Sequence, residues 1–399
     1  MLLSLALIFL SGIALGTLCE KLHLPRLLGM LAAGIILGPY ALNLLDSSVL
    51  NISADLRRIA LLLILTRAGL NLELPVLKSV GRPAILMCFV PACLEILGCI
   101  LIAPLFLPVS VMEAAVLGTV LAAVSPAVVV PKMLNLMEQG YGTKKGIPQM
   151  ILAGASADDV FVIVLFTIFS NLAVNHQFSA WDLIRIPTSI LFGIAAGIVC
   201  GWLLALFFHH VHFRDSLKVV ILLSVSFLLV TLEDNMTGVI GFSGLLATIS
   251  MGITMNIKSN VVSKRISQKY DRLWSGAELL LFVLVGAAVP IGYALDYGIV
   301  AVICLLCILL FRIAGVWLCT IKTKFTAKER FFASLAYIPK ATVQAAIGPL
   351  PLAMGMACGN LVLTVAVLAI IITAPLGAFL IDITHKKLLE KNTEPQTGV

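Results

Sequence analysis

The chain has 399 residues, of which 60% are apolar and 12% are charged, and its mean hydropathy is +1.10. A water-soluble protein cannot cover such a chain with polar surface, so the composition excludes a soluble globular protein and indicates a membrane protein. The formal net charge is +7, and the placement of the basic residues relative to a membrane explains it without a nucleic-acid partner.

Long apolar runs recur along the chain and predict transmembrane helices. A helix needs roughly 20 apolar residues to cross a hydrocarbon core of about 30 Å, whereas the two-residue alternation typical of a membrane β-barrel is absent from the sequence. We therefore predict an all-α polytopic membrane protein with about thirteen transmembrane helices. The predicted spans are 2–19, 25–45, 57–72, 82–107, 110–132, 147–174, 185–208, 216–233, 238–256, 275–295, 298–320, 331–354 and 358–382.

The basic residues indicate the orientation, because Lys and Arg accumulate in the loops on the inner side of a membrane. With the N-terminus outside, most of the 27 basic residues fall in inner loops or in the tail 386–399, and Arg57, Arg58 and Arg185 fall in outer loops. The first span lacks a following A-x-A cleavage site and is interpreted as a true helix rather than a signal peptide. We expect an integral protein of the plasma membrane or the bacterial inner membrane, with a cytoplasmic C-terminus.

Thirteen spans can form two six-helix halves joined by the seventh span, and because seven is odd the second half enters the membrane in the opposite sense. Span 110–132 contains Ser125-Pro126, and its counterpart, span 331–354, contains Pro339-Lys340. Proline removes an amide donor and clashes with the preceding turn, so both helices are expected to be interrupted and to cross as discontinuous helices. Freed carbonyls and half-helix ends coordinate small cations in such inverted-repeat transporters. A simple proline kink is the structural alternative for each span.

Charged residues inside the predicted spans are candidates for function, since a buried charge costs at least about 2.5–3.5 kcal/mol on insertion scales. Three acidic and three basic residues have zero net charge, as mutual pairing would require. In chain order they are Arg67, Glu95, Asp158, Asp159, Arg312 and Lys340. We interpret the set as an ion site at the two aspartates with a supporting ion-pair network formed by Glu95, Arg312, Lys340 and Arg67.

Several roles stay open for the members of that network. Glu95 and Arg312 lie on symmetry-related spans, and they can form an ion pair that braces the helices or take part in ion coupling. Lys340 lies beside the break in its span and can neutralise carbonyl ends or Asp158. Arg67 lies near the inner end of its span and can instead extend its guanidinium to the interface.

Asp158 and Asp159 lie near the middle of span 147–174, in the sequence GASADDVFVIVLF. Adjacent positions on a helix diverge by about 100°, so one carboxylate can face an aqueous cavity while the other turns toward a basic partner. The small residues 154–157 allow a neighbouring helix or water to approach closely. Protons and Na⁺ can compete for such a carboxylate, and competition at one site is enough for exchange if the site reaches each side only when loaded. A structural acid pair is the alternative.

Six segments carry a family resemblance that covers nearly the whole chain. They are RAGLNL at 67–72, the P-x-x-x-E of Pro91 to Glu95, AVSPAVVVPKML at 123–134, QGYGTKKGIP at 139–148, ASADDV at 155–160 and IPKATVQAAIGPL at 338–350. At these segments the sequence resembles the cation/proton antiporter superfamily, specifically the two-aspartate branch and within it the NHA-type sodium/proton exchangers.

The resemblance implies a sodium/proton antiporter fold of about 13 helices, in which an ion-translocating core moves like an elevator against a scaffold that forms a homodimer. Over the single exchanger domain 1–399, it assigns 1–79 and 185–297 to the scaffold, 80–174 and 298–385 to the core, and 386–399 to a short cytoplasmic tail. It also implies that Asp159 binds the ion and that Asp158 assists, and Ser125 at the helix break joins them as an ion-site candidate.

Electrogenic relatives carry lysine at the position of Arg312. Because arginine keeps its proton, the arginine favours electroneutral exchange.

These observations predict a secondary active antiporter that exchanges Na⁺ or Li⁺ for H⁺, with Na⁺ bound at Asp159 and Asp158 and with no cofactor. A K⁺/H⁺ antiporter of the same fold, similar to Kef systems, is the alternative, and a cation channel is a further one. We predict no enzymatic activity, since the YD and GxGD contexts of intramembrane aspartyl proteases are absent from the predicted spans.

Overall fold

The computed structural model describes residues 1–72, 81–174, 182–211, 213–236 and 241–392 of the chain. Within these ranges the regular secondary structure is helical and contains no strand. Eight helices of the same ranges are long and apolar enough to cross a membrane, among them α1, α10, α15 and α19. The prediction of an all-α polytopic membrane protein is confirmed, while the number of thirteen spans stays a prediction.

The helices follow the predicted spans closely in most of the chain. The first half contains α1 (Leu2–Lys21), α2 (Arg26–Leu37), α3 (Ser47–Asn51), α4 (Ser53–Asn71), α6 (Arg82–Met87), α7 (Val90–Phe106), α8 (Val111–Ala122), α9 (Pro126–Glu138), the 3-10 helix η1 (Thr143–Lys145) and α10 (Ile147–Val174). The second half contains α11 (Asp182–His210), α12 (Asp215–Asn235), α13 (Gly244–Lys258), α14 (Asn260–Ala288), α15 (Ile291–Cys319), α16 (Ala327–Ala336), α17 (Thr342–Ile347), α18 (Leu350–Ala353) and α19 (Gly359–Leu388).

Helix α14 departs from its predicted span, 275–295. It begins fifteen residues earlier, at Asn260, and it ends at Ala288, before Pro290. Its polar first half still buries Ile266, Tyr270 and Trp274, which recur every four residues and form one packed face. The mean hydropathy of the segment did not predict this helix, because the residues of its polar face lower the mean. The buried face nevertheless stabilises the helix.

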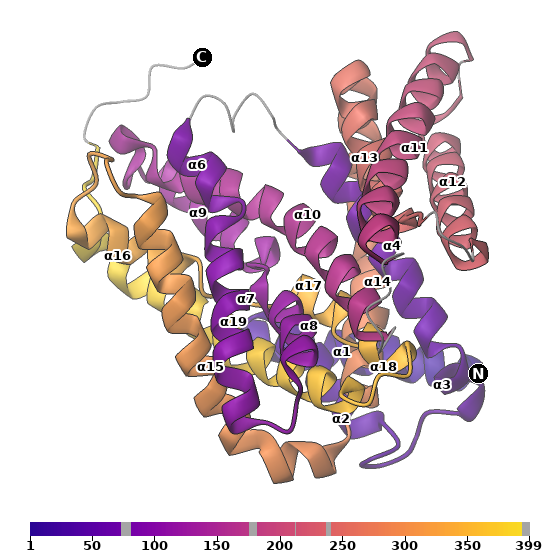
Figure 1. The fold of residues 1–399 in the computed structure, drawn as a ribbon, viewed down its shortest axis with the longest axis horizontal. Helices are drawn as coiled ribbons and strands as arrows, with labels where there is room; N and C mark the ends of the chain where they lie inside the picture. Colours follow the sequence, from indigo (N-terminus) through magenta and orange to yellow (C-terminus); the bar gives the residue numbers. More distant parts are fainter. Residues whose placement is uncertain (73–80, 175–181, 212, 237–240, 393–399) are drawn as a thin grey trace.

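The helices form two groups. Helices α1, α2, α4 and α11–α14 contact one another and form what we call the α4 group, and helices α6–α10 contact α15–α19 and form the α10 group. In Figure 1, α7, α15, α16 and α19 lie on the left and α11, α12 and α13 lie on the right. The contacts between the groups are made mainly by α10 and α17, which pack against α4, α11, α13 and α14. A seam between two helix groups therefore runs through the molecule beside α10.

Both predicted helix interruptions are present, and they meet in the α10 group. Helix α8 ends at Ala122 and α9 begins at Pro126, while α16 ends at Ala336 and α17 begins at Thr342. The two extended segments are joined by a hydrogen bond of 2.8 Å in which the Ser125 amide donates to the Pro339 carbonyl. Proline at the first position of α9 costs that helix no hydrogen bond, which explains why α9 restarts there. The prediction of crossed discontinuous helices is confirmed.

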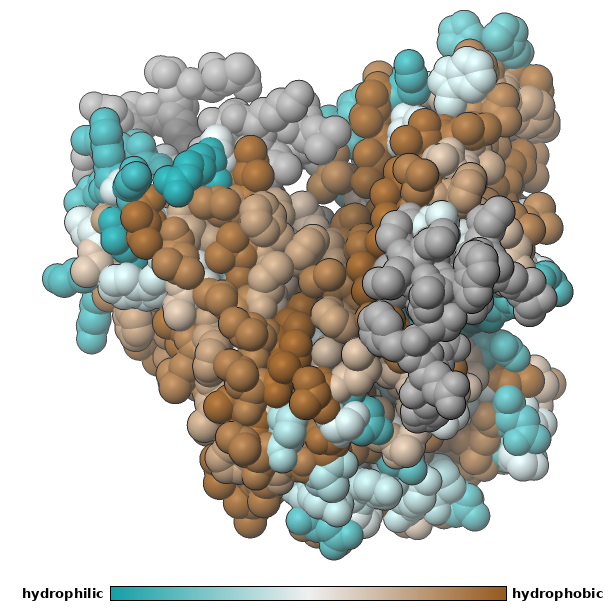
Figure 2. Space-filling view, in the orientation of Figure 1, coloured by the Kyte–Doolittle hydropathy of each residue, from teal (hydrophilic) through white to brown (hydrophobic). Residues whose placement is uncertain are grey.

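The outer surface of the molecule is suited to lipid. Figure 2 shows apolar side chains across the middle of the face in view and polar side chains gathered toward its upper and lower edges. Large apolar side chains are exposed along α11, including Leu191, Ile198, Trp202 and Leu203. Water would disfavour such a surface, whereas a bilayer accommodates it, so the fold places its apolar exposed faces where a hydrocarbon core would contact them.

Candidate functional site

The two adjacent aspartates lie at the middle of α10, and both are buried: Asp158 is 0% exposed and Asp159 is 6% exposed. The small residue Gly154 one turn earlier allows a close approach from the neighbouring helices. A Cβ atom there would lie 2.5 Å from the Tyr337 hydroxyl and 2.7 Å from the Cβ of Met87. The Tyr337 hydroxyl donates to the Met87 carbonyl at 3.0 Å, so this contact ties α6 to the end of α16 beside the aspartates.

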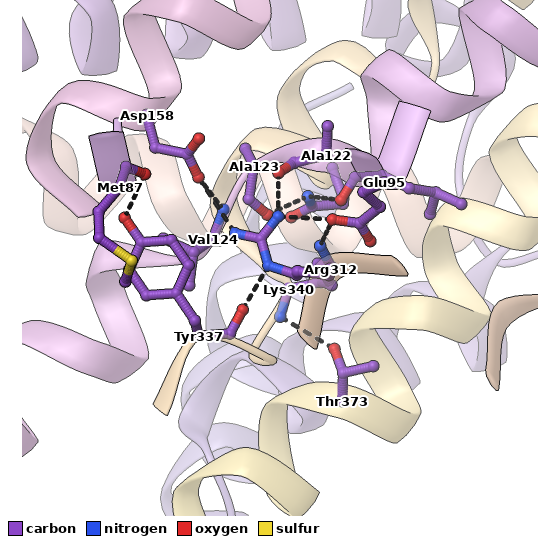
Figure 3. Close-up of polar contacts among 12 residues, drawn as sticks. Met87, Glu95, Ala122, Ala123, Val124, Asp158, Arg312, Tyr337, Lys340 and Thr373 are labelled. Carbon is purple, nitrogen blue, oxygen red and sulfur yellow. Dashed lines mark hydrogen bonds and ion pairs between the residues drawn. The ribbon is translucent and has the colours of Figure 1, made fainter. Parts of the chain in front are cut away.

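Asp158 is held by the core of the α10 group (Figure 3). Its Oδ2 atom accepts a 2.8 Å hydrogen bond from the Val124 amide, in the break between α8 and α9, and lies 3.2 Å from Nη2 of Arg312. The amide and the guanidinium together compensate the negative charge of Asp158. Asp158 therefore has the geometry of a fixed carboxylate rather than of one that is free to bind a cation.

Arg312 on α15 contacts Asp158, Glu95 and the backbone of both helix breaks. Its Nη1 atom lies 2.5 Å from Oε2 of Glu95 and also donates to the Ala122 carbonyl, and its Nε atom donates to the Tyr337 carbonyl at 2.5 Å. The planar guanidinium fork suits several acceptors at once, which an ammonium group could not reach in the same geometry. The guanidinium thus satisfies carbonyls that the broken helices α8 and α16 leave without helical partners.

Lys340 completes a neutral cluster with these residues. Its Nζ atom lies 2.6 Å from the same Oε2 atom of Glu95, and all four side chains are between 0% and 1% exposed. Two carboxylates, Glu95 and Asp158, are thus balanced by two basic groups, Arg312 and Lys340. A buried cluster of zero net charge avoids the desolvation cost of an unpaired ion.

Other polar side chains near the crossing satisfy the remaining backbone groups. Nε2 of Gln344 donates to the carbonyls of Ala123 at 2.9 Å and Leu121 at 3.3 Å, and the Lys340 amide donates to the Thr373 hydroxyl at 2.9 Å. Gln344 was not among the residues predicted for the site, although it lies in the segment IPKATVQAAIGPL. The sequence could have indicated Gln344, because it is a polar residue one turn after a helix break, where exposed carbonyls need hydrogen-bond donors.

Asp159 faces the seam between the two helix groups. It lines a cavity of about 400 Å³, whose other lining residues are Ile64, Arg67, Ala68, Asn71, Pro126, Ala127, Val130, Pro131, Leu152, Trp274 and Thr342. These residues come from α4 and α14 of the α4 group and from α9, α10 and α17 of the α10 group. On the opposite side Asp159 borders a void of only about 10 Å³, lined otherwise by apolar residues and alanines. A void of that size barely holds one water molecule, so Asp159 is open to one side of the seam and closed to the other.

Three oxygen atoms near this cavity are buried and have no hydrogen-bond partner in the described part of the structure. They belong to the Asp159 carboxylate (Oδ1), the Ser125 hydroxyl and the Thr342 hydroxyl. Asp159 and Thr342 line the cavity, and Ser125 directly precedes Pro126, which also lines it. Carboxylate and hydroxyl oxygens are the ligands that hard cations prefer. Ser125 was predicted from the sequence, whereas Thr342, which lies two residues after Lys340, was not.

Arg67 lies apart from the neutral cluster. Its Nε atom lies 2.6 Å from Oδ1 of Asp271 on α14. The structure thus brings together four of the six charged residues expected inside the membrane, Glu95, Asp158, Arg312 and Lys340. Of the other two, Arg67 is paired with a residue that lay outside the predicted spans, and Asp159 makes no ion pair within the described residues. Arg67 stays outside the cluster because α4 and α14 belong to the other helix group. Asp159 stays outside it because the adjacent position on α10 points about 100° away from Asp158, toward the seam.

Comparisons with known proteins show which family and which fold the chain shares. The family model described as "Sodium/hydrogen exchanger, transmembrane" matches residues 5–387. Sodium/hydrogen exchanger 9B2 of Xenopus tropicalis is 34% identical over 97% of this chain and 75% of its own length, and sodium/hydrogen exchanger 9B1 of Homo sapiens is 33% identical over 99% of this chain and 79% of its own length. Among solved structures, the sodium proton antiporter MjNhaP1 from Methanocaldococcus jannaschii superimposes with a TM-score of 0.82 and 22% identity, over 96% of this chain and 97% of its own. The last likeness shows a shared fold.

Proposed function

The chain belongs to the sodium/hydrogen exchanger family, and we propose that it exchanges Na⁺ or Li⁺ for H⁺ across a membrane with Asp159 as the residue that carries either ion. One observation carries this assignment: Asp159 is the carboxylate of the aspartate pair that faces a cavity, while Asp158 is bonded to Arg312 and to the Val124 amide. A buried carboxylate without a basic partner binds a proton or a cation to avoid an uncompensated charge. Hydroxyls of Ser125 and Thr342 supply further oxygen ligands for the cation.

The charge balance of the site supports a one-for-one exchange. Glu95, Asp158, Arg312 and Lys340 sum to zero and satisfy one another. Asp159 is therefore neutral when it holds a proton, and it forms a neutral complex when it holds Na⁺. Because the loaded site has the same net charge in both cases, each turnover moves no net charge across the membrane.

The two helix groups support elevator-type alternating access. The Asp159 cavity lies on the seam between them, and the apolar void on its other side is closed by residues of both groups, including Ile64 of α4 and Val343 of α17. Movement of the α10 group as a unit along the α4 group would close the cavity on one side and open it on the other. We assign 80–174 and 298–385 to this moving core and 1–79 and 185–297 to the scaffold. The scaffold's exposed apolar faces, such as that of α11, also suit the contact of a homodimer.

The cavity lies toward the inner side of the proposed topology. Arg67 and Asn71 occupy the last two turns of α4, and both line the cavity, whereas the closed void borders Leu61 and Leu65 in earlier turns. With the N-terminus outside, α4 runs inward, so this conformation is open to the cytoplasm. We place the protein in the plasma membrane or bacterial inner membrane in this orientation.

Transport in proteoliposomes tests the function directly. An outward gradient of Na⁺ or Li⁺ is expected to drive proton uptake into vesicles that contain the protein, in the presence of valinomycin and equal K⁺ on both sides. With valinomycin omitted, equal or greater proton movement with K⁺ as the only gradient would favour a K⁺/H⁺ antiporter. Cation flux without any proton movement would favour a channel and contradict the proposal.

Exchange is also expected to be independent of membrane potential. Vesicles clamped with valinomycin and K⁺ gradients at 0 mV and at about −100 mV should show initial rates of Na⁺-driven proton movement within about 1.5-fold of each other. The reason is that the loaded site is neutral with either ion, so the potential does no work on it. One net elementary charge moved through −100 mV would instead change the free energy of each turnover by about 2.3 kcal/mol. A several-fold change in rate would indicate that a second proton moves with each cycle.

A further inference from the structure

Arg67 shares the Asp159 cavity, and the proposed mechanism leaves this residue without a role. Among the residues that line the cavity, Arg67 and Asp159 are the two with a formal charge, and they are opposite in sign. Arg67 is held at 2.6 Å by Asp271, and the two side chains are 34% and 46% exposed. A permanent positive charge in the path of a transported cation opposes its entry, so its position requires an explanation.

The part of α4 that contains Arg67 lies close to Asp159. Ile64 and Ala68, on the turn of α4 that contains Arg67, line both the open cavity and the closed void, and Asp159 lines both as well. Trp274, one turn after Asp271 on α14, lines the cavity too. The ion pair between Arg67 and Asp271 therefore lies within the α4 group at the wall of a cavity whose carboxylate belongs to the α10 group.

We propose that Arg67 sets the apparent cation affinity by acting as a tethered competitor of the transported cation for Asp159, and that Asp271 holds it away from that carboxylate. The inference rests on the proposed function of Asp159 and adds a residue that regulates cation binding there. The ion pair with Asp271 sets the apparent cation affinity, because only a guanidinium released from Asp271 can occupy the position of Na⁺.

The chemistry of the three groups supports this competition. A guanidinium stays protonated and forms strong charge-assisted contacts with a carboxylate. Its pair with Asp271 is partly exposed to water, where such pairs are weak, whereas a pair with the buried Asp159 would form in a medium that screens charge less. Glu278 on α14 also interacts electrostatically with Arg67 and with Arg26, so a second acid of α14 favours retention of Arg67 on that helix.

A double-mutant cycle with a binding readout tests the proposal. The full-length protein in detergent is titrated with Na⁺ and with Li⁺, and the apparent dissociation constant is taken from the rise in Tm with cation concentration. Asp271→Asn is expected to weaken cation binding about tenfold, equivalent to about 1.4 kcal/mol, because it releases Arg67. Arg67→Gln is expected to leave the affinity equal or up to about threefold tighter. The double variant is expected to match Arg67→Gln within about twofold.

The matched control uses another ion pair of α4, in which Arg58 bonds both oxygens of Asp234 on α12 at 2.7 and 2.8 Å. Neither residue lines the Asp159 cavity, so Asp234→Asn is expected to leave the cation affinity unchanged. Asp271→Glu, which keeps the charge, is expected to retain an affinity within about threefold of the unmodified protein.

The cycle also separates this inference from the proposed function. An unchanged affinity in Asp271→Asn, or a tenfold loss that persists when Arg67 is glutamine, would overturn the competitor role, since the second result describes a simple field effect of Asp271. Weaker cation binding in Arg67→Gln would overturn it as well, because removal of a competitor cannot lower the affinity for the cation. Loss of the Na⁺-dependent rise in Tm in Asp159→Asn supports the ion site independently, and its persistence would remove the proposed function together with the inference.

Discussion

Asp159→Asn is expected to abolish Na⁺-driven proton movement and to leave a folded protein. The amide keeps the size of the carboxylate but cannot bind a proton in the physiological range, and it offers a cation no negative charge. Asp159 makes no ion pair among the described residues and lies beside a cavity, so its neutralisation leaves no basic partner unpaired. Initial rates in proteoliposomes should fall to the level of empty vesicles, which corresponds to a loss of more than about 100-fold.

The folded state of this variant is checked by its elution as a single species in detergent and by its Tm, which is expected to equal or exceed that of the unmodified protein without Na⁺. Glu113→Gln serves as a control, because Glu113 is a half-buried acid outside the Asp159 cavity that caps the start of α8 through Ser110. Its loss should cost about 1 kcal/mol or less of stability and no transport coupling. Residual Na⁺-dependent exchange in Asp159→Asn would place the ion at another residue.

Arg312→Met is expected to destabilise the protein more than the loss of any partly exposed ion pair. The side chain is 1% exposed and contacts Glu95, Asp158 and two backbone carbonyls, those of Ala122 and Tyr337. Its removal would leave two buried carboxylates with Lys340 alone, and breaking a buried ion pair costs about 3–5 kcal/mol. Thermal unfolding in detergent and the yield of monodisperse protein measure the effect.

Three further variants define the size of this effect. Arg58→Met removes a partly exposed pair, whose side chains are 38% and 50% exposed, and it should cost no more than about 1 kcal/mol. The double variant Glu95→Gln/Lys340→Met removes one charge of each sign from the neutral cluster, and it should be more stable than Glu95→Gln alone, which leaves an excess positive charge. A Tm of Arg312→Met within about a degree of the unmodified protein would show that the buried network does not stabilise the fold.

The identities of the interacting pairs show where sequence reasoning reached its limit. Glu95 and Arg312 are 217 residues apart, and the internal symmetry of the predicted spans was enough to suggest that they meet. The same reasoning placed Lys340 near Asp158 or near carbonyl ends, whereas its ammonium group lies on Glu95. It also placed Arg67 in the network, although the partner of Arg67 is Asp271, in a polar segment whose hydropathy did not predict a helix.

The membrane environment, the helical fold, the two helix interruptions and the aspartate pair were determined by the sequence itself. Each depends on short-range properties: the hydropathy of about 20 consecutive residues, the missing amide of proline, and the turn of about 100° between adjacent helical positions. Tertiary structure alone decided that Asp158 is bonded to Arg312 while Asp159 faces the seam, and that Gln344 and Thr342 lie at the candidate site. These outcomes depend on how helices far apart in the chain pack, because packing sets which charges come within about 3 Å of each other and which oxygen atoms are left without a partner.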